Sequence, residues 1–260
     1  MLSTARLAEW YAAHGRHLLP WRATRDRWAV LVAEVMLQQT QVARVEQMWE
    51  PFLARFPDPQ TAAAAGPGAL IAAWDRLGYP RRARRLWEIA AHVSEHGWPE
   101  DLTKLPGVGR YTAGAVAAEA DDADTIALDT NVRRVVERVA GHRLSQRGAD
   151  DATRRLGGAL SGRDRLLALM DLGALVCTKR SPSCAQCPLH DSCATRGVLA
   201  DERASRQPPF AGSFRQRRGQ VLAALRNAPT AVDRLDADAL ASLVDDGLAE
   251  VRGLVAALPA

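Results

Sequence analysis

Hydrophobic residues recur at intervals of three and four along most of the first 195 positions, the spacing of one face of an α-helix. This region shows no long alternation of the kind expected for strands, and residues that favour helices, such as Ala, Leu, Arg and Glu, are abundant. Turn signals at Gly66-Pro67, Gly78-Tyr79-Pro80 and Pro106-Gly107 separate the periodic segments. The pattern therefore predicts an all-α protein. The expected helices are 3–14, 27–41, 42–55, 67–77, 80–96, 111–120, 129–140, 149–160 and 164–176.

The last sixty residues follow a different pattern. Residues 198–213 are polar, include Pro208-Pro209 and predict a linker. Residues 214–227 and 236–245 are expected to be helices, and the short apolar runs that follow are typical of a small hairpin. Two helices and a hairpin would form a small winged-helix-like module over 214–260. A merely helical, solubilising tail is the alternative.

Charge is unevenly distributed along the chain. The net charge is +4, but residues 1–228 hold 32 basic and 24 acidic residues, whereas the remainder is acidic. Nearly all of the positive charge is arginine, because Lys104 and Lys179 are the only lysines. The basic part favours a polyanionic partner. No apolar run is long enough for a membrane span and no signal segment precedes the charged start, so we expect a soluble cytoplasmic protein without membrane contact.

Four cysteines, the only ones in the chain, lie close together with the spacing C-x6-C-x2-C-x5-C. Four thiolates are the ligand set of a tetrathiolate metal site. Structural zinc usually takes its cysteines from two short pairs, whereas the single C-x2-C here has wide arms that suit a larger cluster. The spacing therefore favours iron–sulfur over zinc, and two disulfides least. The ligands would be Cys177, Cys184, Cys187 and Cys193.

Two glycines, Gly107 and Gly109, stand directly before the helix expected at 111–120. Glycines at this position let the backbone turn so that several N–H groups point to one phosphate oxygen. Such a contact holds a nucleic-acid backbone without reading its sequence. Taken alone, the pair is more typical of an ordinary glycine-bearing turn, and its meaning depends on the other motifs.

Two carboxylates have the surroundings that acid–base chemistry requires. Asp129 precedes an amphipathic helix, where it is expected to cap the first turn and could also stabilise a developing cation. Glu34 lies in an apolar stretch, where burial raises a carboxyl pKa into the range of a general acid. A glutamate that simply faces solvent is the alternative. The run from Gln38 to Gln41 suggests that this helix ends at a polar partner such as unpaired bases.

Together these features resemble the helix-hairpin-helix DNA glycosylases of the endonuclease III superfamily, and within it the A/G-specific adenine glycosylases of the MutY type. The resemblance covers roughly residues 5–197. It is carried, in the family's order, by the cysteines and by Leu19-Pro-Trp-Arg, Glu34-Val-Met-Leu-Gln-Gln-Thr, Leu77-Gly-Tyr, Leu105-Pro-Gly-Val-Gly-Arg-Tyr-Thr-Ala-Gly, Leu128-Asp-Thr-Asn-Val and Met170-Asp-Leu-Gly-Ala.

The resemblance implies a two-lobed fold with a [4Fe–4S] cluster on the four cysteines. Residues 1–22 and 134–197 would form the cluster domain, and 23–133 a six-helix barrel with the hairpin motif at about 98–118. The implied partner is double-stranded DNA containing a mispair, bound by a monomer associated with the nucleoid.

The resemblance also assigns roles to individual residues. Glu34 would protonate the base and help activate water, and Asp129 would stabilise the sugar cation, with Asn131 and Tyr111 in support. The implied pocket for the flipped base contains Trp21, Arg22, Leu37 and Asp171. The implied DNA contacts are Gln39, Thr40, Leu77, Tyr79, Gly107, Val108 and Gly109, with Gln39 and Tyr79 near the opposite base.

Two departures from the family limit what the resemblance implies. Bifunctional members have a lysine where this chain has Tyr111, so we expect a monofunctional enzyme that leaves an abasic site. Residues 214–260 are too short for the family's usual C-terminal reader of 8-oxoguanine, which leaves the opposite-base preference open. A thymine or uracil mismatch glycosylase on the same fold is one alternative, and a non-catalytic iron–sulfur DNA-binding module is another.

Overall fold

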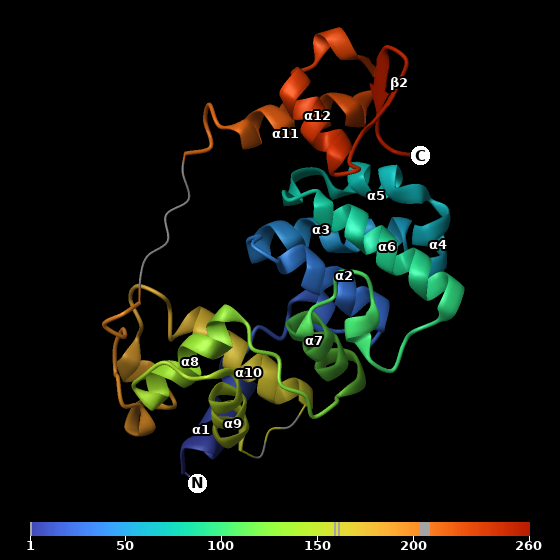
Figure 1. The fold of residues 1–260 in the computed structure, drawn as a ribbon. Helices are drawn as coiled ribbons and strands as arrows, with labels where there is room; N and C mark the ends of the chain where they lie inside the picture. Colours follow the sequence, from blue (N-terminus) through green and yellow to red (C-terminus); the bar gives the residue numbers. More distant parts are fainter. Residues whose placement is uncertain (1, 159, 161, 203–208) are drawn as a thin grey trace. The chain divides into compact units, whose positions relative to one another are not determined.

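The computed structural model describes residues 2–158, 160, 162–202 and 209–260, and it is predominantly helical (Figure 1). The chain divides into two compact units. Unit 1 comprises Met1–Val30 and Val108–Ala204, and unit 2 comprises Leu31–Gly107 and Ser205–Ala260. The helix α2 (Arg27–Leu37) begins in unit 1 and continues into unit 2.

Unit 1 is built around α8, whose apolar face is buried against its neighbours. Val132, Val135 and Val136 of α8 pack in one core with Leu169 and Leu172 of α10. This core also takes side chains from α1, α7 and α9. The helices of unit 1 are α1 (Leu2–His14), α7 (Arg110–Asp121), α8 (Thr130–Ala140), α9 (Gln146–Gly157) and α10 (Gly162–Leu175), with short 3-10 turns at Pro20–Arg22, Cys184–Gln186 and His190–Ser192.

In unit 2, α6 packs against α4 and α5. Leu86, Ile89 and Val93 of α6 are buried at the three- and four-residue spacing of one helix face. The N-terminal elements of this unit are α3 (Val42–Arg55), α4 (Pro59–Ala64), α5 (Gly66–Trp74), a 3-10 turn at Asp75–Leu77, α6 (Arg81–His96) and a 3-10 turn at Leu102–Lys104.

The remainder of unit 2 is a small module of two helices and a sheet, as the sequence predicts. Its elements are α11 (Phe214–Asn227), β1 (Thr230–Ala231), a 3-10 turn at Val232–Arg234, α12 (Ala237–Asp245), β2 (Glu250–Arg252) and β3 (Val255–Ala257). The strands pair antiparallel in the order β1-β3-β2. Leu222, Leu225 and Leu243 form its interior together with Ala256. The tail is therefore a folded module and not a merely helical extension.

Several contacts join this module to the helices of unit 2. Arg84 of α6 donates to the carbonyl oxygen of Asp246 at 2.7 Å, and Arg81 pairs with the carboxylate of the same residue. At the C-terminus, the backbone of Pro259 passes so close to Gly68 of α5 that a Cβ there would collide with it.

The helix expected at 27–41 ends early, at Leu37, because a buried arginine takes over its last carbonyl groups. Arg82 of α6 donates to the carbonyl oxygens of Val35 and Met36 at 2.8 and 3.0 Å and to that of Gln38. It also donates to Leu77 and Gly78, each at 3.0 Å. The arginine run 81–85 therefore includes one buried member, because Arg82 is 7% exposed.

Two further expectations about the organisation of the chain require correction. The helix α4 was not expected, because PQTAAA lacks an apolar period, although Asp58 caps it by accepting from the N–H of Thr61. Residues 108–133, expected in the barrel, belong to unit 1, where α7 packs against α10. In the expected linker, 203–208 lie outside the described residues.

Within the part of the chain that the structure describes, no helix is long and apolar enough to cross a membrane.

Replacing Arg82 with alanine is expected to destabilise unit 2 by roughly 3 kcal/mol, because several buried carbonyl groups lose a charged donor at once. Arg44→Ala is the matched control, since Arg44 is exposed and donates to one carbonyl, that of Arg76. Thermal unfolding followed by circular dichroism measures the effect. Equal midpoints for the two variants would show that Arg82 does not hold the end of α2.

Candidate functional site

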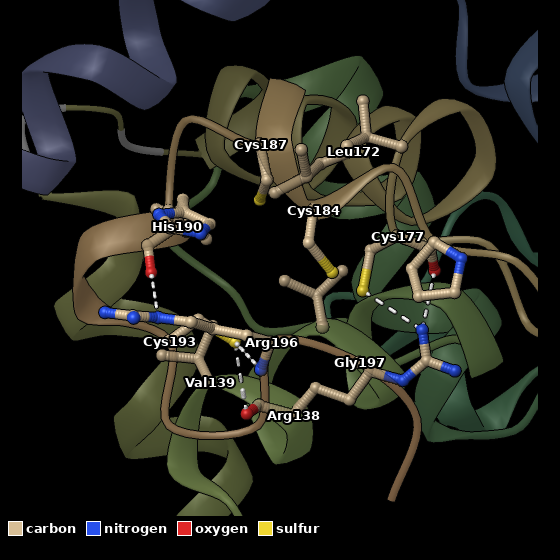
Figure 2. A pocket seen from close by; sticks show the side chains of 14 residues that line it. Arg138, Val139, Leu172, Cys177, Cys184, Cys187, His190, Cys193, Arg196 and Gly197 are labelled. Carbon is tan, nitrogen blue, oxygen red and sulfur yellow. Dashed lines mark hydrogen bonds between the residues drawn. The ribbon is translucent and has the colours of Figure 1, made fainter.

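The four cysteines of unit 1 line one cavity (Figure 2). Cys177 follows α10, Cys184 and Cys187 flank a 3-10 turn, and Cys193 ends the next turn. The remaining wall is largely apolar and is formed by Val135, Val139, Leu172, Val176, Pro182 and Leu189. The loop thus turns back on itself and presents all four sulfurs to the same enclosed space.

The donor set and its surroundings fit a thiolate-bound cluster. Arg138 donates to the Sγ of Cys177, and the N–H of Arg196 donates to the Sγ of Cys193, both at 3.4 Å. Such N–H donors stabilise sulfur that carries negative charge. Burial raises the pKa of Cys177, and it raises the pKa of Cys187 to about 11, so these two thiols would lose their protons on binding metal.

Arg138 of α8 joins both ends of the cysteine loop. Its buried guanidinium donates to the carbonyl oxygens of Thr178 and Lys179 at 2.8 and 3.0 Å, just after the first cysteine. Its own carbonyl oxygen accepts from the hydroxyl of Thr195 at 2.6 Å, just after the last. Glu202 balances the charge of Arg138 with an ion pair of 2.7 Å. The loop is therefore attached to α8 at both ends.

Asp129 lies at the other end of α8, where it is the N-cap residue, as expected. The Asp129 carboxylate accepts from the N–H of Val132 at 2.6 Å and from the side-chain amide of Asn131 at 2.7 Å. Burial nevertheless raises the pKa of Asp129. The two hydrogen-bond donors oppose this rise in pKa, because they stabilise the ionised carboxylate. They also hold the carboxylate in one orientation, in partly apolar surroundings.

Arg134 connects the Asp129 end of α8 to the cysteine loop. It donates to the side-chain oxygen of Asn131 at 2.8 Å and to the carbonyl oxygen of Cys177 at 2.7 Å. It also donates to the carbonyl oxygen of Gly173 at 2.5 Å. Asn131 thus gives one hydrogen bond to Asp129 and accepts one from Arg134, which fixes the orientation of its amide.

Gly173 of α10 lies against the same asparagine. A Cβ at Gly173 would come within 2.7 Å of the Cβ of Asn131 and 2.9 Å of its carbonyl oxygen, which is closer than side chains pack. Glycine is therefore required here for the close approach of α10 to the start of α8. This explains the glycine in the motif Met170-Asp-Leu-Gly-Ala.

The residues expected to form the base pocket in unit 1 occupy a buried ion-pair network. Asp171, fully buried, accepts from both terminal nitrogens of Arg22 at 2.6 and 2.8 Å and from the Nε of Arg16 at 2.6 Å. Burial raises the pKa of Asp171, but the hydrogen bonds and positive charges of Arg22 and Arg16 together outweigh this effect, so the pKa lies below its usual value. Trp21 is also buried, so these side chains build an interior wall. Tyr111 is half-buried and packs against the core of unit 1.

In unit 2, Glu34 is buried, with 4% of its surface exposed, in a helix whose neighbouring residues Leu31 to Met36 are all buried. The alternative of a glutamate facing solvent is therefore wrong. Leu37 is half-buried, and Gln38 and Gln39 after it are exposed.

The expected DNA contacts of unit 2 separate into exposed and interior residues. Gln39 and Tyr79 are exposed, and both have a positive φ, at 55° and 48°. Leu77 is buried, and its carbonyl oxygen accepts from the hydroxyl of Thr40 at 3.1 Å. Leu77 and Thr40 therefore support the turn that presents Tyr79.

The hairpin before α7 presents backbone at its glycines. Gly107 has φ +65°, and a side chain there would collide with Arg85, so glycine is required. Gly109 is exposed and is the N-cap residue of α7, which has no side-chain hydrogen bond at its start. A Cβ added at Gly109 would have no heavy atom within 4 Å. Val108 points inward and is buried. The N–H groups at the start of α7 therefore face an open approach.

Arg82, Arg134, Arg138 and Glu202 belong to this architecture but were not identified from the sequence. For Arg134 and Arg138 a signal was present, because the four-residue interval places them on one face of the helix that begins at Asp129. Glu202 follows the cysteines in a segment without periodicity, so nothing in the sequence indicates its partner.

Comparison with known proteins gives two family matches. Residues 32–156 match the HhH-GPD superfamily of base excision DNA repair proteins. Residues 177–193 match the iron–sulfur binding domain of endonuclease III. The second match spans all four cysteines and identifies their cavity as a [4Fe–4S] cluster site, as expected.

Individual relatives cover most of the chain. An adenine DNA glycosylase of Mycolicibacterium smegmatis is 43% identical over 96% of this chain and 93% of its own length. A thymine-DNA glycosylase of Aeropyrum pernix is 35% identical over 72% of this chain and 91% of its own length. Among solved structures, a thermostable thymine-DNA glycosylase superposes with a TM-score of 0.66 at 26% identity, over 74% of this chain and 94% of that chain.

Replacing Gly173 with alanine is expected to displace Asn131, and, if Asp129 is catalytic, to lower the base-excision rate by about tenfold or more. Gly148→Ala in α9 is the control, since a Cβ there meets its nearest neighbour at 3.3 Å. The measurement is a single-turnover rate per iron-loaded molecule. If both alanine variants react equally fast, the packing at Gly173 does not position the carboxylate.

Proposed function

The chain belongs to the adenine DNA glycosylases of the HhH-GPD superfamily, and we propose that it removes adenine mispaired with 8-oxoguanine or guanine from double-stranded DNA. The observation that carries this proposal is the buried carboxyl group of Glu34, whose neighbours in α2 from Leu31 to Met36 are apolar and buried. Hydrolysis of a purine N-glycosidic bond needs a proton on a ring nitrogen, and a buried carboxylic acid is the group that supplies one.

The proposed reaction divides its work between two carboxyl groups. Glu34 protonates the adenine ring and then helps activate water, and Asp129 stabilises the positive sugar. Asn131 and Arg134 support the second role, because they hold Asp129 in one orientation. When bound, the [4Fe–4S] cluster supplies a rigid link among four points of the loop 177–193, to which Arg134 and Arg138 are bonded.

The target base must leave the helical stack before Glu34 can reach it. We propose that Trp21 and Arg22 in unit 1, and Leu37 in unit 2, are among the residues that receive the flipped base. Because the guanidinium of Arg22 is paired with the carboxylate of Asp171, these two residues would hold neighbouring side chains in place and would not bind the base directly. Tyr111 occupies the place of the lysine in bifunctional relatives, so the proposed product is an abasic site with an intact backbone.

Contacts to DNA are proposed at two segments. The N–H groups at Gly107 to Gly109 and at the start of α7 would hold a phosphate of the backbone. Gln39 and Tyr79 would contact the bases beside the flipped nucleotide, which their exposure supports. The monomeric state remains a prediction.

Excision of thymine or uracil opposite guanine is the second candidate, supported by the 35% identity to a thymine-DNA glycosylase. The identity to an adenine glycosylase is higher and covers more of the chain. Because only 4% of the chain lies outside that match, it includes most of the C-terminal module. Adenine is therefore the better supported base.

Asp129→Asn and Glu34→Gln are each expected to lower the single-turnover excision rate by about 10³-fold while duplex affinity stays near that of the unaltered protein. The first change removes the charge that stabilises the sugar cation, and the second removes the proton. Asp151→Asn and Glu50→Gln, at exposed positions, are the matched controls. A variant that retains full rate would remove its residue from the mechanism.

A panel of mispaired duplexes, followed by alkali to cleave abasic sites, tests the substrate. Adenine opposite 8-oxoguanine is expected to be released faster than thymine or uracil opposite guanine. Discrimination between 8-oxoguanine and guanine is expected to be weaker than in relatives with the usual C-terminal reader. Processing of T:G with no release of adenine would overturn the assignment and establish the thymine alternative.

A further inference from the structure

The segment that follows the last cysteine borders the same cavity as the cysteine loop, although it lies outside the family match to residues 177–193. Arg196 and Gly197 line this cavity, as Figure 2 shows. The backbone N–H of Arg196 donates to the Sγ of Cys193 at 3.4 Å. Residues 194–202 are called the strap below, and their contacts with α8 decide how firmly the strap is held beside the sulfurs.

One residue of α8 holds the strap at two points. Near the start of the strap, the carbonyl oxygen of Arg138 accepts from the N–H and the hydroxyl of Thr195, at 3.2 and 2.6 Å. Beside this contact, the carbonyl oxygen of Val139 accepts from the N–H of Ala194 at 3.0 Å. At the end of the strap, the guanidinium of Arg138 pairs with Glu202. The second attachment therefore depends on the Glu202 side chain.

The ion pair at Glu202 is buried and has two hydrogen bonds. Its Oε1 accepts from the Nε of Arg138 at 2.9 Å, and its Oε2 accepts from the Nη2 at 2.7 Å. The side chains of Arg138 and Glu202 are 1% and 9% exposed. Two parallel N–H···O bonds fix the plane of a guanidinium, which a single contact does not. Glu202 thus sets the orientation of the Arg138 head group.

This orientation directs the other donors of Arg138 to the cysteine loop. Because a guanidinium is planar and its donors have fixed directions, an edge that is bound to Glu202 leaves the remaining N–H groups pointing away from the carboxylate. Those groups donate to the Sγ of Cys177 at 3.4 Å and to the carbonyl oxygens of Thr178 and Lys179 (Figure 2). Glu202 therefore acts on a cysteine sulfur through Arg138.

Backbone strain occurs within the strap. Arg196 has a φ of 45°, in the left-handed region that favours glycine. Strain of this kind persists where the surrounding structure imposes it. The Nε of Arg196 donates to the carbonyl oxygen of His190 at 3.3 Å, which ties the strained residue to the cysteine loop. Attachment of the strap on both sides of Arg196 opposes its relaxation away from Cys193.

We propose that Glu202 is a positioning residue of the cluster site, which fastens the strap beside the cavity and directs Arg138 to the sulfur of Cys177. In this role Glu202 slows the loss of iron, because a fastened strap limits access to the cysteines and the N–H donor stabilises the charged sulfur. The inference extends the cluster site beyond the last cysteine. It is independent of which base the chain removes.

The test uses the full, iron-loaded chain with Glu202→Ala or Glu202→Gln. Asp201→Ala is the matched control, because Asp201 is the neighbouring acid, pairs with Arg143 at 2.9 Å and has a side chain that is 61% exposed. Iron release to the chelator bathophenanthroline is followed in anaerobic buffer, at a urea concentration below the unfolding transition of every variant. Unfolding itself is followed by circular dichroism.

Glu202→Ala is expected to release iron about tenfold faster than the unaltered chain. Glu202→Gln should fall between the two, because glutamine keeps one oxygen that accepts from Arg138. Asp201→Ala should release iron at the rate of the unaltered chain.

Two further measurements distinguish positioning from a general loss of stability. The resonance Raman bands of the iron–thiolate bonds are expected to shift in Glu202→Ala, because Arg138 no longer donates to the sulfur of Cys177. Hydrogen–deuterium exchange of the strap amides is expected to become faster in the same variant. Both properties should stay unchanged in Asp201→Ala.

Equal iron release from Glu202→Ala and Asp201→Ala would overturn the inference, and so would unchanged Raman bands or unchanged exchange of the strap in Glu202→Ala. If Glu202→Ala takes up no iron, the same comparisons with Glu202→Gln decide the question. None of these measurements includes base removal, so their results stand whether or not the chain releases adenine.

Discussion

The hydrogen bonds that Arg134 and Arg138 of α8 make to the cysteine loop are the interaction on which the rest of unit 1 depends. Both arginines bond to the segment at Cys177, and Arg134 also bonds to Asn131, which in turn bonds to Asp129. A single helix therefore carries the Asp129 carboxylate, proposed to be catalytic, at its start and the attachment of the cysteine loop farther along. In this arrangement the cysteine loop is tied to the carboxylate through Arg134 and Asn131, which fits a structural role for the site.

In unit 2, Arg82 likewise joins separate segments of the chain by donating hydrogen bonds to several of their carbonyl groups. Its guanidinium ends α2 and fixes the turn at Leu77 and Gly78, so the exposed residues Gln39 and Tyr79 are both held by one buried cation. Burial lowers the pKa of Arg82 to about 10, which still leaves it charged at neutral pH. Lysine offers three donors at one point, whereas the planar guanidinium offers five in a fixed fork. This difference gives a physical reason for a chain with two lysines and many arginines.

Local signals in the sequence predicted much of this structure. Apolar periodicity located most helices, the cysteine spacing indicated the cluster, and the D-G turn before two apolar runs indicated the hairpin of β2 and β3. What could not be predicted depends on contacts between distant segments. The end of α2 at Leu37 is set by an arginine 45 positions later, and the pairing of Arg138 with Glu202 spans 64. Nothing in the sequence around Arg22 or Asp171 shows that they neutralise each other in the interior.

The hydrogen bonds described above imply that the cysteine loop positions Asp129 through Arg134. The most direct test is the single-turnover rate of adenine release, per iron-loaded molecule, for Arg134→Gln and Arg134→Lys, with Arg133→Gln as the control on the neighbouring helix face. Both Arg134 variants are expected to lose about 10- to 100-fold in rate while keeping duplex affinity, because neither side chain can bond to Asn131, Gly173 and Cys177 together. Full rates in iron-loaded Arg134→Gln would contradict this role of Arg134.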